Sequence, residues 1–277
     1  MIDIGNSYYK IGNKINYGGF GNVYVGIHIP TNTRVAVKIT STKYKKNTIA
    51  EYNIYKLLTS TNNVPYVIDL YEHNKNHIMI YELMGYDIGT LFKKMNSRFN
   101  NNTVSKIAFC TLNIIKSMHN NNIIHRDIKP SNFVFNYKMD KIYIIDFGLS
   151  KKYIINGKHI SLGTVNNIVG TIRFAGVNSH LKITLSRRDD IESYAYMLMY
   201  LQNGKLIWQD TKETRKIYSQ KMSISVNKIY KKLPSYICDI FQHAGGLSFH
   251  AIPDYNLLLS FITNSAYYNV NANFEWL

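Results

Sequence analysis

Hydrophobic and polar positions in the first eighty or so residues alternate mainly with a period of two, which is typical of strands with one buried face. A turn at residues 30–33 separates the first two strand-like segments, and a helical pattern covers residues 48–59. The predicted strands are residues 14–26, 34–39, 67–73 and 77–82. This part of the chain therefore predicts a small sheet with one helix.

After residue 85 the apolar positions follow a helical period. Residues 104–120 place an apolar stripe on one helical face, made of Val104, Ile107, Ala108, Thr111, Leu112, Ile115 and Met118. Residues 189–202 are apolar nearly all round, which predicts a helix in the middle of a core. The sequence thus predicts a bilobal α+β fold in a single domain. Residues 1–84 form a strand-rich lobe, residues 85–277 form a larger helical lobe, and a crevice lies near residues 83–85.

Composition adds limits on the class of protein. The chain has 277 residues, of which 45% are hydrophobic and 18% are charged, as in soluble globular proteins. No apolar run approaches the roughly 20 residues that cross a bilayer, and the amino terminus lacks the pattern of a signal peptide. Two cysteines, Cys110 and Cys238, argue against a disulfide framework or a structural zinc site. We expect an intracellular, cytoplasmic or nuclear monomer with no membrane partner.

The net charge of +16 raises the possibility of a nucleic-acid partner. Seven of the 33 basic residues are arginine, while Asn, Ile, Tyr and Lys are abundant. A/T-rich codons would produce that mixture without any selection for a partner. The basic runs at residues 43–46 and 231–232 are explained by solvated surfaces, so nucleic acid is an alternative and not the expected primary partner.

The first strand-like stretch contains a glycine-rich segment at residues 15–24. Glycines let backbone N–H groups approach phosphate oxygens, although a plain β-turn would show the same composition. The candidate nucleotide contacts here are Ile15, Gly18, Gly21 and Val23. Asn16 stands where the pattern G-x-G-x-x-G has its first glycine, and asparagine tolerates unusual backbone angles.

A lysine and a glutamate follow this segment, and their spacing is typical of a nucleotide-binding pattern. Lys38 ends the stretch V-A-V-K, and Glu51 follows thirteen positions later in the predicted helix. In this pattern Ala36 would line the nucleotide site, Lys38 would contact the α- and β-phosphates, and Glu51 would hold Lys38. Taken alone, either charged residue could be solvated, so their significance depends on the motifs downstream.

The strongest motif is at residues 125–132, which match H-R-D-x-x-x-x-N at every fixed position. Asp127 would accept or orient the proton of an attacking hydroxyl. Asn132 would ligate a metal ion such as Mg²⁺, and Lys129 would neutralise a moving γ-phosphate. Asp146, nineteen residues after Asp127, opens a D-F-G triplet and would bind the metal that bridges two phosphates.

The order of these motifs predicts ATP-dependent phosphoryl transfer to protein substrates with Mg²⁺. Families that phosphorylate tyrosine usually lack a lysine at the position of Lys129, which favours serine or threonine. The alternative is a pseudokinase scaffold with little transfer. The intact set of polar residues argues against it, and Asn16 is its one support.

The chain also resembles the casein kinase 1 family of serine/threonine protein kinases over nearly its whole length. The strongest matches are residues 170–181, G-T-I-R-F-A-G-V-N-S-H-L, and residues 186–193, S-R-R-D-D-I-E-S. That family reads close to S-I-N, T-H-L-G and S-R-R-D-D-L-E-S in this region. Shorter similar stretches occur at residues 81–85, 199–201, 204–209 and 221–223.

The resemblance implies a protein kinase fold and three further features. Adenine would dock on the backbone from Glu82 to Met84, and Asp190 would anchor the catalytic loop. Substrates would be acidic or already phosphorylated near the target hydroxyl. Arg173 and Lys221 match the family's anion site, where an arginine fork and a lysine suit an oxyanion. The alternative for Arg173 is a salt bridge that orders the activation segment.

Three positions besides Asn16 depart from the family's pattern. Tyr81 stands where a medium-sized residue usually gates the back of the ATP pocket, so we expect ligands that reach past it to fit poorly. Gly176 and Val177 replace the usual Ser-Ile, which leaves the form of the substrate platform open.

Overall fold

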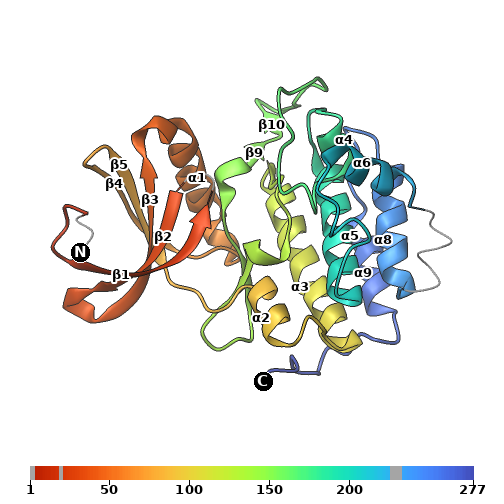
Figure 1. Cartoon of the computed structure of the whole chain (residues 1–277), viewed down its shortest axis with the longest axis horizontal. Helices are drawn as coiled ribbons and strands as arrows, with labels where there is room; N and C mark the ends of the chain where they lie inside the picture. The colour runs from red at the N-terminus through yellow and green to blue at the C-terminus, as the bar shows by residue number, and fades with distance from the viewer. Residues whose placement is uncertain (1–3, 19–20, 225–232) are drawn as a thin grey trace.

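The computed structural model describes residues 4–18, 21–224 and 233–277. Figure 1 shows a sheet with one helix beside a larger, mainly helical part. This arrangement confirms the predicted bilobal α+β fold. The chain passes from the sheet to the helical part between β5, which ends at Glu82, and α2, which begins at Ile88.

The sheet has five antiparallel strands in the order β1-β2-β3-β5-β4. They are β1 (Tyr9–Gly18), β2 (Gly21–His28), β3 (Thr33–Ser41), β4 (Val67–His73) and β5 (Asn76–Glu82). The predicted strand at residues 14–26 is a hairpin of β1 and β2, with Gly18 opposite Gly21. The short 3-10 helix η1 (Ile29–Thr31) separates β2 from β3, and Asn32 ends it at a φ of 52°.

Each face of this sheet carries a cluster of buried apolar side chains. Val35 and Val37 pack in a cluster on one face, together with Ile4 from the segment before β1. Ala36 packs on the other face, in the large core that also includes residues of helix α1. Because strand side chains alternate, Lys38 lies on the same face as Ala36 and is directed toward α1.

Helix α1 (Lys45–Leu58) begins three residues before the predicted segment, after the 3-10 helix η2 (Thr42–Tyr44). A second 3-10 helix, η3 (Thr59–Thr61), follows it. One face of α1 is buried and consists of Thr48, Glu51, Ile54, Tyr55 and Leu58. The helix therefore presents an acidic and a phenolic side chain on the side that packs against the sheet.

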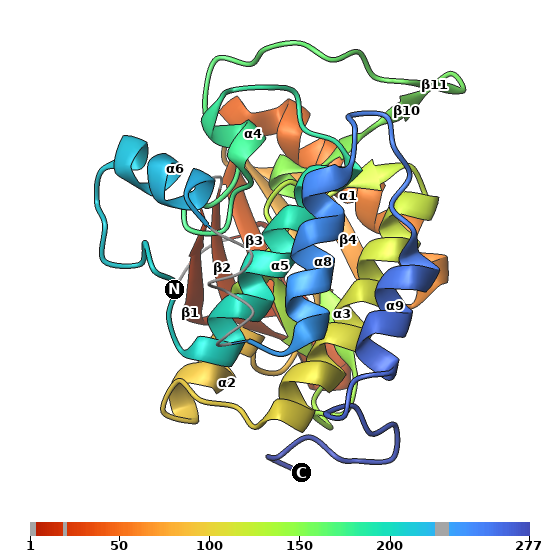
Figure 2. The same cartoon turned by 90° about the vertical axis from the view of Figure 1, so that its right-hand side faces the viewer.

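The helical part contains α2 (Ile88–Lys94), α3 (Asn101–Asn120), α4 (Val177–His180), α5 (Arg187–Asn203), α6 (Thr214–Met222), α8 (Ser235–Gly246) and α9 (Tyr255–Thr263). Figure 2 shows α3, α5, α8 and α9 alongside one another. Every residue of the predicted apolar face of α3 is buried, which confirms that face. The helix starts earlier than predicted because the Asn100 side chain accepts the Thr103 N–H at 2.7 Å.

Helix α5 is buried on almost every side, as its sequence predicts. It begins two residues before the predicted segment, and Asp189 Oδ2 accepts the Ser186 N–H at 2.7 Å at this end. Gly204 ends the helix with a φ of 82°, a left-handed conformation that glycine adopts readily. No helix in the described part of the chain is long and apolar enough to cross a bilayer.

Short strands and turns between α3 and α4 carry the remaining motifs. They are β6 (Ile123–Ile124), η4 (Pro130–Asn132), β7 (Phe133–Phe135), β8 (Ile142–Ile144), η5 (Phe147–Leu149), β9 (Lys151–Lys152), β10 (Ile154–Ile155) and β11 (Lys158–His159). Strand β6 pairs with β9, and β7 pairs with β8. These pairings hold the H-R-D and D-F-G segments beside each other, next to α1.

Candidate active site

Lys38 and Glu51 form a buried ion pair between β3 and α1. The Lys38 ammonium lies 2.7 and 2.8 Å from the two Glu51 carboxylate oxygens and 3.4 Å from Asp146 Oδ1. Burial alone would lower the pKa of Lys38, but the negative charges of Glu51 and Asp146 outweigh it and raise that pKa. The lysine thus stays charged, as the binding of phosphate requires.

The catalytic loop is anchored from within the helical part by Asp190 of α5. Its two carboxylate oxygens accept the backbone N–H groups of His125 at 2.7 Å and Arg126 at 2.8 Å. His119 Nε2 lies 2.9 Å from the same carboxylate. Burial alone would raise the pKa of Asp190, but interactions with His119 and His125 lower it below its usual value. These contacts confirm the anchoring role that the family resemblance implied for Asp190.

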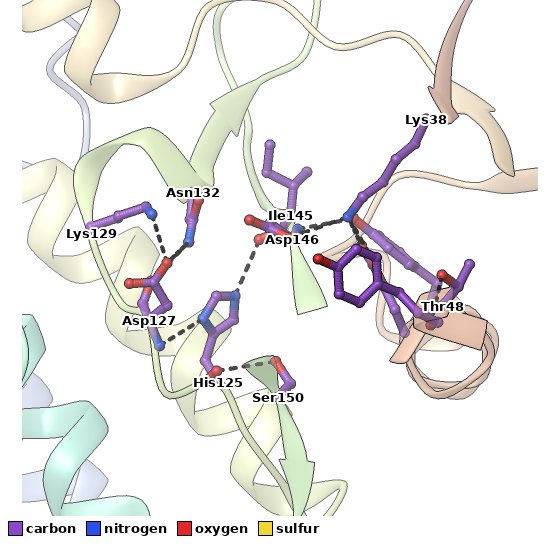
Figure 3. Close-up of polar contacts among 12 residues, drawn as sticks. Lys38, Thr48, His125, Asp127, Lys129, Asn132, Ile145, Asp146 and Ser150 are labelled. Atoms are coloured by element: carbon purple, nitrogen blue, oxygen red, sulfur yellow. Dashed lines mark hydrogen bonds and ion pairs between the residues drawn. The ribbon is translucent and has the colours of Figure 1, made fainter. Parts of the chain in front are cut away.

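Asp127 is held on both carboxylate oxygens. Its Oδ1 accepts the Thr171 N–H at 2.7 Å, and its Oδ2 lies 2.6 Å from the Lys129 ammonium. The same lysine donates to Thr171 Oγ1 at 2.9 Å. Figure 3 shows Lys129 and Asn132 directed at Asp127. The arrangement fixes a carboxylate and places a cation beside it.

Thr171 is a site residue that the sequence motifs did not single out. It follows Gly170, whose φ is 90° and whose position would place an added Cβ only 2.5 Å from the Arg126 carbonyl oxygen. Glycine thereby allows the activation segment to approach the catalytic loop closely. The signal that could have found Thr171 is its place after this glycine in the G-T-I-R stretch.

Asn132 and Asp146 offer the oxygen atoms that suit a hard cation. The Asn132 amide nitrogen donates to the Asp127 carbonyl oxygen at 2.8 Å, so its side-chain oxygen is the atom left for a metal. Burial alone would raise the pKa of Asp146, but the charges of Lys38, His125 and Lys129 lower it overall. An ionised carboxylate and an amide oxygen fit Mg²⁺.

The D-F-G segment is turned so that its aspartate faces Lys38 (Figure 3). Asp146 has a φ of 67°, in the left-handed region. Phe147 is buried, with its ring edge-on to Tyr55 at a centroid distance of 4.8 Å and 5.4 Å from the ring of His125. The phenylalanine therefore fills a core position while the carboxylate is presented to the site.

The predicted nucleotide contacts lie on β1, β2 and β3. Ala36 is buried, Val23 is half-buried and Ile15 is 51% exposed. An added Cβ at Gly21 would lie 2.6 Å from the Ile39 carbonyl oxygen, so a side chain is excluded there.

Gly19 and Phe20, which belong to the predicted glycine-rich segment, lie outside the described residues. Gly18 ends β1, and Asn16 pairs with Val23 in the ladder between β1 and β2. The asparagine therefore lies at a paired position of the strand, next to a register shift between Lys14 and Asn16.

The link between the two lobes is fixed at each end. The Glu82 N–H donates to Tyr66 O at 2.9 Å, and the Gly85 N–H donates to Phe135 O at 2.7 Å. Between them, the Met84 N–H makes no hydrogen bond to another residue that the structure describes. It is thus available to the edge of a bound base, as the predicted adenine contact requires.

The two predicted anion-site residues differ in exposure. Arg173 is exposed, and its guanidinium forms no ion pair within the described ranges, which does not support the alternative of an ordering salt bridge. Lys221 is only 2% exposed, and its ammonium donates to the carbonyl oxygens of Ile172 at 2.8 Å and Ala175 at 2.5 Å. Burial lowers the pKa of Lys221 to about 7, although the negative charge of Glu192 acts in the opposite direction. The lysine therefore lies beneath the segment from which Arg173 projects.

Comparison with known families agrees with this geometry. A family model described as protein kinase domain matches residues 9–243, which is most of the chain. The chain belongs to the protein kinase domain family. Members of this family generally transfer phosphate from ATP to proteins with the help of Mg²⁺, and the family supports that activity for this chain.

Proposed function

We propose that this protein is an active kinase that phosphorylates serine or threonine. The observation that carries the proposal is a pair of ammonium groups, each beside one carboxylate of the candidate site. Lys38 lies 3.4 Å from Asp146, and Lys129 lies 2.6 Å from Asp127. A γ-phosphoryl group between them would meet a cation on either side, which is the electrostatic requirement of the transfer.

The scaffold alternative lacks a corresponding observation. Asn16 is the one departure that could weaken nucleotide binding, and its backbone keeps the strand pairing of the hairpin. The ion pair between Lys38 and Glu51 is closed, so no rearrangement of α1 is needed before transfer.

Transfer of labelled phosphate from ATP to serine, threonine and tyrosine versions of one acidic peptide tests the proposal. We expect transfer to serine and threonine, and a loss of about 10²- to 10⁴-fold in Asp127→Asn, which keeps the shape but not the charge. Transfer to none of the peptides with Mg²⁺ or Mn²⁺ would favour the scaffold, and preferential transfer to tyrosine would overturn the assignment to serine and threonine.

We further propose a casein kinase 1-like enzyme that favours acidic or already phosphorylated substrates. Arg173 supports this preference because its guanidinium is exposed beside the activation segment and is not neutralised by a described carboxylate. Lys221 would hold the backbone on both sides of Arg173.

Paired peptides, identical except for one phosphoserine before the target residue, separate this preference from general activity. We expect Arg173→Ala to slow phosphorylation of the primed peptide far more than that of the unprimed one. Arg215→Ala is the matched control, since Arg215 is an exposed arginine of α6 and its loss removes the same charge. Equal slowing of both peptides by Arg173→Ala would overturn the anion-site assignment.

We also propose that residues 1–84 and 85–277 are the two lobes of one monomeric domain. One continuous core cluster supports this, because it contains Ala36 of the sheet, Tyr55 of α1 and Phe133 of the catalytic region. Light scattering should give a mass near 32.1 kDa, and a dimer mass at micromolar concentration would contradict the proposal.

A further inference from the structure

Phe135 of β7 joins the helical part to the link between the lobes. Its N–H donates to the Tyr86 carbonyl oxygen at 2.9 Å, and its carbonyl oxygen accepts the Gly85 N–H at 2.7 Å. An added Cβ at Gly85 would lie 2.8 Å from the Asn136 carbonyl oxygen, so glycine allows the link to lie against the end of β7. The backbone directly after Met84, whose N–H is the predicted adenine contact, is therefore held by one strand.

Two aromatic side chains from residues 272–277 cover the ring of Phe135, which is fully buried. Phe274 meets this ring edge-on at a centroid distance of 5.2 Å, and Trp276 meets it edge-on at 5.1 Å. Phe274 and Trp276 stack on each other at 4.9 Å with an interplanar angle of 5°. The Trp276 ring also lies 5.5 Å from the ring of Phe99. Because edge-on and stacked pairs have preferred geometries, these rings restrict the position of Phe135.

Polar contacts fix residues 272–277 at the same place. The Trp276 indole N–H donates to the Met139 carbonyl oxygen at 3.3 Å, in the turn between β7 and β8. The Glu275 carboxylate accepts the Asn100 N–H at 3.2 Å, and the Glu275 N–H donates to Thr103 Oγ1 at 3.3 Å. Figure 1 shows this end of the chain beside the first turn of α3. The segment therefore connects the start of α3 to the turn between β7 and β8.

Two aromatic rings in a core would stabilise a fold at any position. This pair is distinguished by the residue on which it packs, because Phe135 also makes both hydrogen bonds to the link. The path from Trp276 to Met84 thus has two steps, the side chain of Phe135 and the paired backbone of residues 85 and 86. A binding group that is already held in its bound geometry loses less conformational freedom when the ligand arrives, which raises affinity.

We propose that Trp276, supported by Phe274, is a positioning residue for nucleotide. It fixes Phe135 and thereby keeps the link in the conformation that presents the Met84 N–H to the edge of adenine. The groups proposed for transfer lie on β3 and in the catalytic loop, so this role affects nucleotide affinity and leaves the rate of transfer unchanged. The inference rests on the proposed function, because the Met84 N–H matters only if a nucleotide binds at the link.

Trp276→Leu tests the proposal because it keeps an apolar side chain and removes both the aromatic contact with Phe135 and the indole N–H. Trp276→Phe is a milder variant that keeps one ring, in case the first does not fold. The matched control is Phe109→Leu. Phe109 is half-buried like Trp276, and its ring pairs with that of Tyr268 at 5.1 Å. The control therefore removes an aromatic pair of the helical part that does not include Phe135.

Three measurements on the full chain separate positioning from stability, each at a temperature where the variants are folded. Calorimetry gives the affinity for adenosine, which has the base but no phosphate and so reports on the link. Steady-state transfer from ATP to a peptide gives KM and kcat. Hydrogen exchange of the peptide that carries residues 82–87 reports on local opening of the link itself.

We expect Trp276→Leu to weaken adenosine binding and to raise KM for ATP about three- to tenfold, the range for one weakened hydrogen bond. The value of kcat should be unchanged, as when binding common to the ground and transition states is lost. Exchange at residues 82–87 should become faster. Trp276→Phe should change the same quantities in the same direction by less, and Phe109→Leu should match the wild type in all of them.

Wild-type adenosine affinity or wild-type exchange in both Trp276 variants would refute the proposal. An equal change in Phe109→Leu, or a loss confined to kcat, would also refute it. A wild type that bound no adenosine and transferred no phosphate would instead contradict the proposed function. Hydrogen exchange does not require nucleotide, so in that case unchanged exchange at residues 82–87 in both Trp276 variants would still exclude the coupling of Trp276 to the link.

Discussion

Replacing Asp190 with Asn should disrupt the catalytic loop through a change of a single atom. The carboxylate accepts three donors, the N–H groups of His125 and Arg126 and Nε2 of His119. An amide keeps one acceptor oxygen, so its NH₂ group must face at least one backbone N–H. Each lost charged hydrogen bond costs about 1.5–3 kcal/mol, and the buried donor left behind adds about 1–3 kcal/mol. Partial relaxation of the loop reduces the sum, so we expect a loss of about 2–4 kcal/mol in the free energy of unfolding.

The loss of activity should exceed what the loss of stability explains. Arg126 has a φ of 68° and is followed directly by Asp127, so release of its N–H lets the catalytic carboxylate move. A displacement of about 1 Å in such a site can cost about 100-fold in rate. We expect that order of loss in kcat, measured by transfer of labelled phosphate at a temperature where the variant is fully folded.

The pH dependence of the stability difference between the wild type and Asp190→Asn provides a second, independent test. The folded-state pKa of Asp190 is lowered, so its carboxylate stabilises the fold above the unfolded value of about 3.9. That stabilisation is lost as the pH falls through the folded pKa. Urea unfolding of the wild type and Asp190→Asn should therefore begin to converge below about pH 4 and agree most closely once the pH is below the folded pKa. Asp210→Asn is the control, because Asp210 is exposed. If Asp190→Asn changed the free energy of unfolding and kcat no more than Asp210→Asn does, the reasoning would be refuted.

The remaining prediction concerns the buried ammonium of Lys221. Its pKa of about 7 lies below the usual lysine value of about 10.4, so between these pH values the unfolded chain binds more protons and stability rises with pH. His180, whose Nε2 lies 3.2 Å away, has a pKa lowered to about 4 by burial and by Lys221, so it stays neutral throughout this range. We expect the free energy of unfolding of the wild type to rise by about 3 kcal/mol relative to Lys221→Met between pH 7 and 10. A constant difference in urea unfolding across that range would contradict the lowered pKa.

The sequence predicted most elements because their apolar periodicity is a local property. The strand at residues 67–73 and the buried face of α3 agree with the structure. The pattern predicts one strand at residues 14–26, where the structure has a hairpin, because the alternation continues through the glycine-rich segment. The start of α1 was missed because its first residues, Lys45, Lys46 and Asn47, are polar and carry no apolar signal.

The site was predictable where motifs have fixed spacing, and less so where partners come from distant segments. The pairing of Lys38 with Glu51 follows from a motif and is confirmed. Tyr55 resembles any apolar residue of an amphipathic helix, because the partner of its hydroxyl, the Asp146 N–H, is 91 residues away. The family resemblance predicted Lys221 as an anion ligand. In the structure its ammonium is covered by the rings of Tyr196 and Trp208, at 5.0 and 5.2 Å. No local sequence pattern indicates this burial.

Three buried helix residues hold the groups of the site in place, and this arrangement limits the effect that Asn16 can have. Glu51 holds Lys38, Asp190 holds the catalytic loop, and Tyr55 holds Asp146, and each of these supporting residues is buried in a helix. A group fixed from a packed core keeps its geometry whether or not a surface loop closes above it. The charged groups proposed to bind phosphate and metal therefore do not depend on the glycine-rich hairpin for their position. For this reason the loss of one hairpin glycine should affect nucleotide affinity more than the chemistry of transfer, and an intact site beneath an altered hairpin supports an enzyme rather than a scaffold.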